Sequence, residues 1–282
     1  MHKIWILLFC IFCTLYQTSM PAKAAEQISF DTPICLTVNG TYLAMDAEPF
    51  LHEGVTFVPI RFVSEALGAD VLWDSENSCA LIYLDNTMIE LPIGKKYALV
   101  NGKKTALSQG VKLVYDRTYV PVRFAAETLG FDVDWESSTY TVVISKNGIS
   151  VPEHLEGERG YDDSEIYWLS KIIHAESRGE PMKGKIAVGN VVLNRVESNE
   201  FPNTVYGVIF DKKYGVQFSP ILDGSIHQTP LGDSVVAAKR ALSGETEAED
   251  CLYFLNPRTA TSSWIINNRT YLKTIANHDF YL

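Results

Sequence analysis

The chain has 282 residues, of which 24 are lysine or arginine and 34 are aspartate or glutamate, so its net charge is −10. An acidic chain lacks the basic surface that supplies most of the affinity for nucleic acids, and nucleic-acid binding is therefore excluded as its main role. The length fits two domains better than one.

The first 25 residues predict a secretory signal peptide. His2 and Lys3 precede an apolar run over residues 4–16, and Ala22-Lys23-Ala24 has the A-x-A pattern of a cleavage site. The apolar run is shorter than the roughly 20 residues that span a membrane, so an uncleaved anchor is the less favoured alternative. We therefore expect an exported protein.

Three cysteines remain after such a cleavage, namely Cys35, Cys79 and Cys251. A disulfide between Cys35 and Cys79 is compatible with export. The odd number argues against a disulfide framework, and burial as small apolar side chains is the alternative. The sequence leaves both open.

Residues 26–146 predict a β-rich domain that is built from a repeat. The segment VPIRFVSEALGADVLWD at 58–74 recurs as VPVRFAAETLGFDVDWE at 120–136, an offset of 62 residues, and a Val-Asn-Gly turn at 38–40 recurs with the same offset. Alternating β-branched and aromatic residues, Asn-Gly turns and a short helix closed by glycine predict a ββαββ unit in each copy.

The matched side chains of the two copies have structural interpretations. Trp73 and Trp135 are interpreted as core anchors rather than sugar platforms, and Arg61 and Arg123 as locally paired. His52 is the only histidine of this domain, so its sequence shows no metal-ligand spacing. The repeated blocks resemble the copper amine oxidase-like N-terminal domain. The resemblance implies a non-catalytic stalk or a wall-associated module, with neither copper nor oxidase activity.

Residues 147–163 are rich in glycine, proline and charge, which is typical of a linker. The second domain, 164–282, opens with four apolar residues at helical spacing: Ile166, Leu169, Ile172 and Ile173. Glu176 falls inside the same apolar arc, near the helix end that Gly179 marks. A carboxyl group on an apolar wall has a raised pKa and can act as a general acid. The alternative is a fringe residue paired with Arg178 or Lys171.

Residues 183–196 predict a buried central helix, because apolar side chains surround most of its circumference. Asn190 and Asn194 share one face of this helix. They either line a cleft or hydrogen-bond to nearby backbone groups, and the sequence does not decide between the two. A third helix is predicted over 234–242, ending at Gly244.

Several blocks of the second domain resemble the SleB/CwlJ family of cell-wall hydrolases: A-E-S-R-G-E-P at 175–181, Q-F-S-P at 217–220, Y-F-L-N-P at 253–257 and H-D-F at 278–280. The resemblance implies a compact, mainly helical, lysozyme-like domain, and hence an α+β protein of two domains. It also implies cleavage of peptidoglycan glycan strands by a secreted protein of the cell wall or the spore. It identifies Glu176 as the catalytic acid. The remaining blocks supply candidate substrate-binding residues: Gln217, Phe218, Ser219, Tyr253, Asn256, Thr261, His278 and Phe280.

Three positions depart from the family pattern. Leu255 stands where an aromatic residue is usual before Asn-Pro, Ala276 stands where glycine is common, and Cys251 replaces a small residue. All three leave the acid itself unchanged.

The reaction type is inferred from the number of acids. Glycosidases usually use two carboxylates, and the sequence shows no convincing second acid near Glu176. A single acid suits a lytic transglycosylase, with a lysozyme-type muramidase as the alternative. We expect no cofactor and no metal, because the histidines show no H-E-x-x-H spacing, which disfavours a metal-dependent amidase. A non-catalytic wall-binding protein is the remaining alternative, and peptidoglycan is the expected partner in every case.

Overall fold

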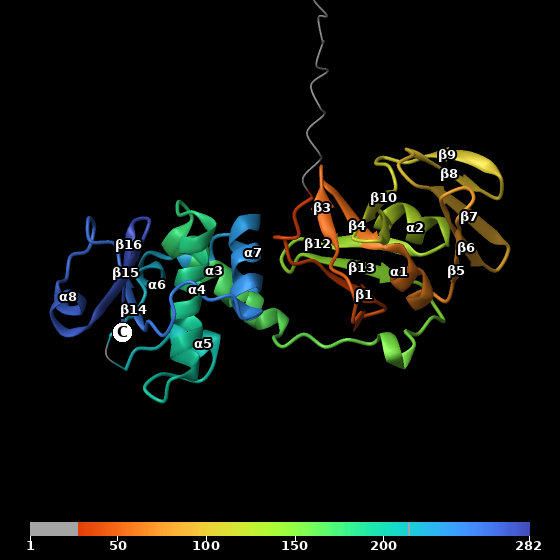
Figure 1. Ribbon diagram of the computed structural model, residues 1–282. Helices are drawn as coiled ribbons and strands as arrows, with labels where there is room; N and C mark the ends of the chain where they lie inside the picture. Colours follow the sequence, from red (N-terminus) through yellow and green to blue (C-terminus); the bar gives the residue numbers. More distant parts are fainter. Residues whose placement is uncertain (1–27, 214) are drawn as a thin grey trace, which may run out of the picture.

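The structure is a computed structural model that describes residues 28–213 and 215–282. The predicted signal peptide, 1–25, lies outside the described residues. The chain forms a β-rich N-terminal domain and a helical C-terminal domain that lie side by side (Figure 1). Within the described part of the chain, no helix is both long and apolar enough to cross a membrane.

The first half of the N-terminal domain contains six strands and one helix: β1 (Cys35–Val38), β2 (Thr41–Tyr42), β3 (Phe50–His52), β4 (Val55–Pro59), α1 (Ile60–Ala66), β5 (Asp70–Asp74) and β6 (Cys79–Leu84). After β7 (Thr87–Pro92), the second half repeats this order: β8 (Tyr97–Val100), β9 (Lys103–Ala106), β10 (Lys112–Val114), β11 (Arg117–Pro121), α2 (Val122–Thr128), β12 (Asp132–Glu136) and β13 (Thr141–Ser145). Four short strands precede each helix, whereas the expected ββαββ unit has two. The additional hairpins have strands of two to four residues, which are too short to show a period in the sequence.

Strands from the two copies interleave in the same sheets. Strand β1 pairs in parallel with β13, β4 pairs with β11, and β7 joins β6 of the first copy to β8 of the second. The two copies therefore share one hydrophobic core, and neither could bury its apolar face alone.

Both short helices end as the sequence predicts. Gly68 and Gly130 follow them with φ of 79° each, a left-handed conformation that favours glycine. Each helix starts directly after the proline of a VP pair, Pro59 or Pro121. The restricted φ of the proline thus fixes the angle between each strand and the helix that follows it.

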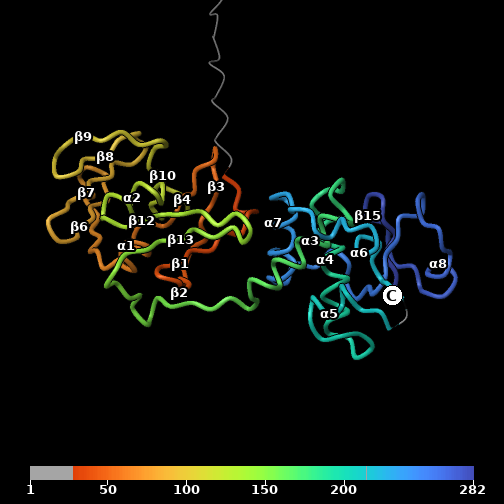
Figure 2. Tube along the Cα trace, turned by 180° about the vertical axis from the view of Figure 1, so that it is seen from behind, coloured from red at the N-terminus to blue at the C-terminus, as the bar shows by residue number. Residues whose placement is uncertain are grey.

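The C-terminal domain packs three long helices around a common core: α3 (Asp163–Ser177), α4 (Met182–Glu197) and α7 (Gly232–Leu242). Shorter elements surround them: α5 (Val205–Ile209), α6 (Pro220–Asp223), η2 (Ser225–His227), β14 (Tyr253–Leu255), α8 (Trp264–Asn268), β15 (Tyr271–Ile275) and β16 (His278–Tyr281). The last three strands form a small sheet in the order β14-β16-β15, seen beside α6 in Figure 2.

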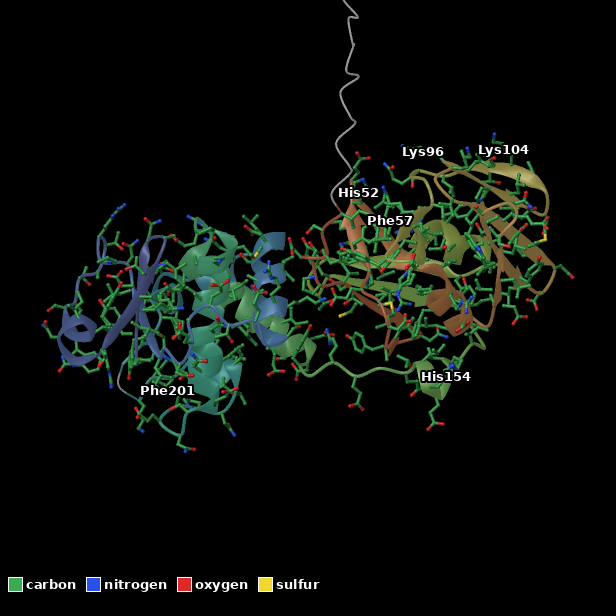
Figure 3. The ribbon with its side chains drawn as sticks, viewed as in Figure 1. His52, Phe57, Lys96, Lys104, His154 and Phe201 are labelled. Carbon is green, nitrogen blue, oxygen red and sulfur yellow. The ribbon has the colours of Figure 1, made fainter. Side chains whose placement is uncertain are left out.

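The segment predicted as a linker packs on the N-terminal domain over most of its length. Val151 and Leu155 are buried in that domain's core, the latter in the turn η1 (Glu153–Leu155). Figure 3 labels His154 on this turn, far from Phe201, which lies in the C-terminal domain. Further on, the Arg159 guanidinium lies over the Tyr42 ring and pairs with Asp163 at 2.6 Å. The connection is therefore held at both ends.

All three cysteines of the described chain are free. The disulfide between Cys35 and Cys79 is therefore absent, and the alternative of small buried side chains holds for Cys79 and Cys251. Cys35 lies instead at the domain interface, where its sulfur is 3.4 Å from the Lys239 amine.

Candidate active site

Glu176 occupies the last turn of α3. The helix begins with a capping box, in which the Asp162 carboxylate accepts from the Glu165 amide and the Glu165 side chain accepts from the Asp162 amide. The four apolar residues predicted to share one face are all fully buried: Ile166, Leu169, Ile172 and Ile173. Glu176, at the C-terminal end of α3, therefore lies at the edge of this buried face.

The Glu176 carboxyl group is half-buried, and none of the described side chains forms a hydrogen bond or ion pair with it. The alternative of a pair with Lys171 is wrong, because the Lys171 amine donates to the backbone oxygens of His227 and Gln228. Burial, and next the negative charge of Asp223, raise the pKa of Glu176 to about 7. Such a group holds its proton near neutral pH and can donate it.

Asp223 is the acid that the sequence did not reveal. It ends α6, and hydrogen bonds from Ser225 lower its pKa, one of them from the Ser225 amide at 2.8 Å. The site therefore contains one carboxyl group whose pKa is raised and one that stays ionised, which is a common arrangement of acid and base. Asp223 lies three residues beyond the Q-F-S-P block. Its approach to Glu176 depends on the turn that brings α6 to the end of α3, and the sequence did not indicate this turn.

Glu180 has the opposite environment from Glu176. Burial favours a higher pKa, but hydrogen bonds from the Asn277 side chain and backbone, together with the charges of His278 and Lys185, lower the pKa overall. The Asn277 bonds are 2.9 Å and 3.1 Å long. Glu180 therefore anchors the β15–β16 turn to the start of α4 as a carboxylate.

The asparagines of α4 satisfy backbone groups, which decides between the two alternatives. Asn190 donates to the Glu245 oxygen and accepts from the Glu247 amide, each at 2.8 Å. Asn194 donates to the Cys251 oxygen at 2.9 Å. These bonds hold the segment that follows α7 against α4.

The candidates of the Q-F-S-P block differ in exposure. Ser219 is exposed at the start of α6, and Gln217 is half-buried and donates to the Gly215 oxygen. Both remain available to a ligand on the side of Asp223. Phe218 is only 3% exposed and belongs to the core around α3 and α4, so a substrate-binding role is corrected to a packing role.

The candidates after α7 are likewise divided. Tyr253 is buried, and its hydroxyl accepts from Arg269 at 2.6 Å. Asn256 is half-buried and Thr261 is exposed, so both stay open to a ligand.

The closing block packs inside the domain. Phe280 is fully buried against Phe254, so the expectation that it binds substrate is corrected. The His278 ring is buried, with Nδ1 4.0 Å from a Glu180 oxygen, and burial lowers its pKa. These residues pack beneath the β15–β16 turn that Glu180 binds. In the short strand β16, the half-buried Asp279 alternates with the buried side chains of His278 and Phe280. This alternation indicates burial, but the resemblance of the block to the family had suggested substrate binding instead.

Among residues 28–213 and 215–282, no group of three or more histidine, cysteine, aspartate or glutamate side chains is placed to hold a metal ion.

Two family models match separate parts of the chain. Residues 37–144 match the copper amine oxidase N-terminal domain, and residues 179–281 match the cell wall hydrolase. The second domain is thus similar to the cell wall hydrolase family over residues 179–281. The match of the hydrolase domain begins three residues after Glu176.

Curated relatives share this region. The spore cortex-lytic enzyme of Bacillus cereus is 42% identical over 121 residues, which are 43% of this chain and 45% of that protein. The spore cortex-lytic enzyme of Bacillus subtilis is 39% identical over 121 residues, 43% of this chain and 38% of that protein. Cell wall hydrolase CwlJ of Oceanobacillus iheyensis is 27% identical over 106 residues, 36% of this chain and 74% of that protein. The chain thus spans less than half the length of these spore cortex-lytic relatives.

Among solved structures, the catalytic domain of the germination-specific lytic transglycosylase SleB from Bacillus anthracis is 40% identical. It aligns with 45% of this chain and 100% of its own length, with a TM-score of 0.41.

Proposed function

We propose that the hydrolase domain cleaves the glycan strand of peptidoglycan next to N-acetylmuramic acid, with Glu176 as the general acid. The observation that carries the proposal is the Glu176 carboxyl group, half-buried, unpaired and with a pKa of about 7. The similarity of residues 179–281 to the cell wall hydrolase family supports the choice of substrate. The protein would act outside the cytoplasm, on the vegetative wall or the spore cortex.

In the proposed transglycosylase reaction, Glu176 gives its proton to the glycosidic oxygen as the bond from that oxygen to C1 of the muramic acid breaks. The carboxylate then takes the proton of the C6 hydroxyl group of the same sugar, whose oxygen bonds to C1. The product ends in 1,6-anhydro-muramic acid, and Glu176 is protonated again. One acid performs both transfers.

Asp223 favours a second candidate reaction. An ionised carboxylate near a protonated one is the pair that a muramidase of the lysozyme type uses, with water as the final acceptor. In that case the product carries a reducing end. In the transglycosylase, Asp223 serves only to raise the pKa of Glu176.

The test is product analysis by mass spectrometry after digestion of purified vegetative wall and of spore cortex. Muropeptides that end in anhydro-muramic acid support the transglycosylase, and reducing ends alone support the muramidase. Glu176→Gln is expected to lower the rate by about 10²–10⁴-fold while the domain stays folded. A variant with near-normal activity contradicts the role of Glu176, and wild-type protein that leaves wall turbidity unchanged supports a purely wall-binding protein.

A further inference from the structure

Two hollows of the N-terminal domain occupy equivalent positions in the two repeats. Their volumes are about 600 Å³ and about 530 Å³. One is lined by α1 and β5 of the first copy, and the other by α2 and β12 of the second. The facing wall of each comes from the other copy, around Thr118 in the first hollow and Thr56 in the second. The interleaved sheets thus build the same site twice.

Each hollow contains an exposed indole. Trp73 is 47% exposed and Trp135 is 38% exposed, so the interpretation of these residues as core anchors is wrong. Both project from the outer hairpins β5–β6 and β12–β13, which lie at the ends of their sheets. A large aromatic face left in water within a concave surface is a feature of ligand-binding sites.

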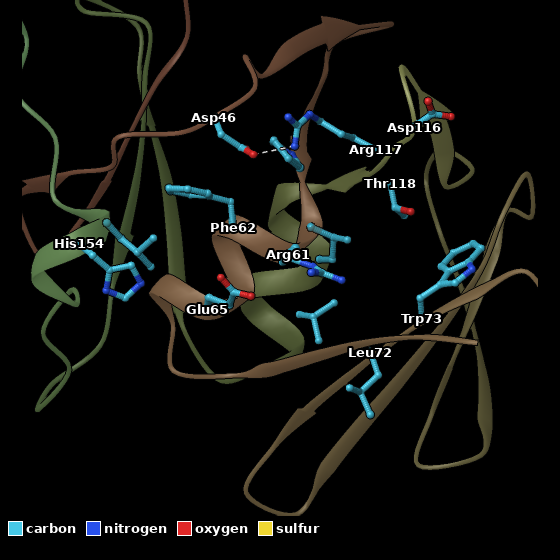
Figure 4. A pocket seen from close by; sticks show the side chains of 14 residues that line it. Asp46, Arg61, Phe62, Glu65, Leu72, Trp73, Asp116, Arg117, Thr118 and His154 are labelled. Carbon is cyan, nitrogen blue, oxygen red and sulfur yellow. Dashed lines mark hydrogen bonds and ion pairs between the residues drawn. The ribbon is translucent and has the colours of Figure 1, made fainter. Parts of the chain in front are cut away.

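A guanidinium group stands beside each indole. Figure 4 shows Arg61 extending from α1 into the hollow that Trp73 borders on the other side. Within the described chain, Arg61 has no hydrogen-bond or ion-pair partner. In the second hollow, Arg123 pairs with Glu127 at 3.0 Å and donates to the Val133 oxygen. The first hollow therefore offers one unpaired guanidinium group, Arg61, whereas its second, Arg117, pairs with Asp46 at 2.6 Å.

The charge of both hollows disfavours anionic ligands. The first contains three carboxylates against two guanidinium groups, and the second contains two against one. A phosphate-rich polymer would meet net negative charge in either. A neutral pyranose ring fits better, because its C–H face can stack on the indole while its hydroxyl and acetamido groups bond to the charged rim.

We propose that the two hollows bind N-acetylated sugar residues of the peptidoglycan glycan strand, so that the N-terminal domain holds the polymer that the hydrolase domain cuts. The choice of this polymer rests on the proposed function. Two equivalent sites on one rigid domain engage a repetitive polymer together, and the second contact forms at high effective concentration. Binding by the pair is then tighter than binding by either site.

The test is co-sedimentation of the full chain with purified insoluble peptidoglycan from which anionic polymers have been stripped, in a Glu176→Gln background that removes cleavage. Trp73→Ala and Trp135→Ala are each expected to weaken binding by about threefold to tenfold, and the double variant by more than either. Leu113→Ala is the matched control, since Leu113 is exposed in the same domain and lines neither hollow. Its binding should equal that of the parent.

A second variant controls for misfolding of the tryptophan variants. Arg61→Ala removes an exposed side chain without a partner, so the domain should keep its circular dichroism and melting temperature while binding weakens. Titration with chito-oligosaccharides should compete with peptidoglycan. Undiminished binding by the double tryptophan variant overturns the proposal, as does binding that requires the anionic polymers.

The two proposals fail separately. Cleavage that depends on Glu176, combined with sedimentation that ignores the tryptophans, overturns only this inference. Cleavage that survives Glu176→Gln overturns only the catalytic role, because sedimentation measures no bond cleavage.

Discussion

Next to burial, the charge of Asp223 raises the pKa of Glu176, although the two lie 47 positions apart in the chain. If protonated Glu176 is the acid, activity must fall as the pH rises through about 7. Asp223→Asn removes the negative charge and lowers the Glu176 pKa, so the falling limb of the pH–rate profile should move to lower pH. The measurement is the initial rate of turbidity loss between pH 4 and pH 9.

The same variant separates the two reactions. In a transglycosylase, the Asp223→Asn rate at pH 5 should stay close to that of the wild type, because Glu176 is protonated in both. A muramidase that uses Asp223 as its second carboxylate should lose activity at every pH. A falling limb that does not move contradicts the influence of Asp223.

Glu176 should also make the protein less stable at alkaline pH. Its pKa in the folded state is about 7, above the unfolded value of about 4.3. The folded state therefore binds more protons in this window, and the free energy of unfolding falls as the pH rises through it. Glu176→Gln, which stays neutral, should be more stable than the wild type at pH 8, by at most about 4 kcal/mol.

Urea unfolding at pH 4 and pH 8 checks this prediction. The two proteins should have similar midpoints at pH 4 and different midpoints at pH 8. Equal stability at both values would show that the carboxyl group is well solvated, which would also remove the basis of the catalytic proposal.

Helices and their ends were accessible from the sequence because they follow local rules. The periodic apolar residues of α3, its acidic first turn and the glycines after α1 and α2 each act within a few positions. The place of Glu176 at the end of the apolar face of α3 could be predicted for this reason. The approach of Asp223 could not, since it depends on how α6 folds back on α3. Trp73 and Trp135 were wrongly assigned to the core because an alternating strand has the same sequence pattern whether the sheet face that carries the tryptophan is covered or exposed to solvent.

Glu180 should stabilise the domain through Asn277. Glu180→Gln leaves one acceptor for two donors, and we expect a loss of about 1–3 kcal/mol. Because the pKa of Glu180 is lowered in the folded state, its contribution is present above the unfolded pKa and is lost as the pH falls through the folded value. The gap between wild type and variant in urea unfolding should therefore shrink at low pH. A gap that is constant with pH would mean that the charge of Glu180 plays no part.

Ala276 should be a strained position. Its φ is 51°, in the left-handed region that costs a residue with a Cβ about 1–2 kcal/mol. Glycine removes this cost but adds entropy to the unfolded chain, so Ala276→Gly should stabilise the domain by about 0.5–1 kcal/mol. Ala260→Gly is the control, at an exposed position outside the positive-φ residues. Thermal unfolding with a melting temperature for Ala276→Gly at or below that of the wild type would contradict the prediction.

Lys239 should couple the two domains. Its side chain projects from α7, is fully buried, and donates to the Thr139 and Tyr140 oxygens of the N-terminal domain at 2.8 Å and 3.1 Å. Lys239→Met keeps the apolar stem but leaves two buried carbonyl groups without their donor, which costs about 1–3 kcal/mol. That cost falls on the interface alone, because neither core loses a contact. Calorimetry should then resolve two unfolding transitions in place of one, and X-ray scattering should show a larger radius of gyration. Lys183→Met, on an exposed part of α4, should leave both unchanged. A Lys239→Met protein with the compactness and single transition of the wild type would show that Lys239 does not couple the domains.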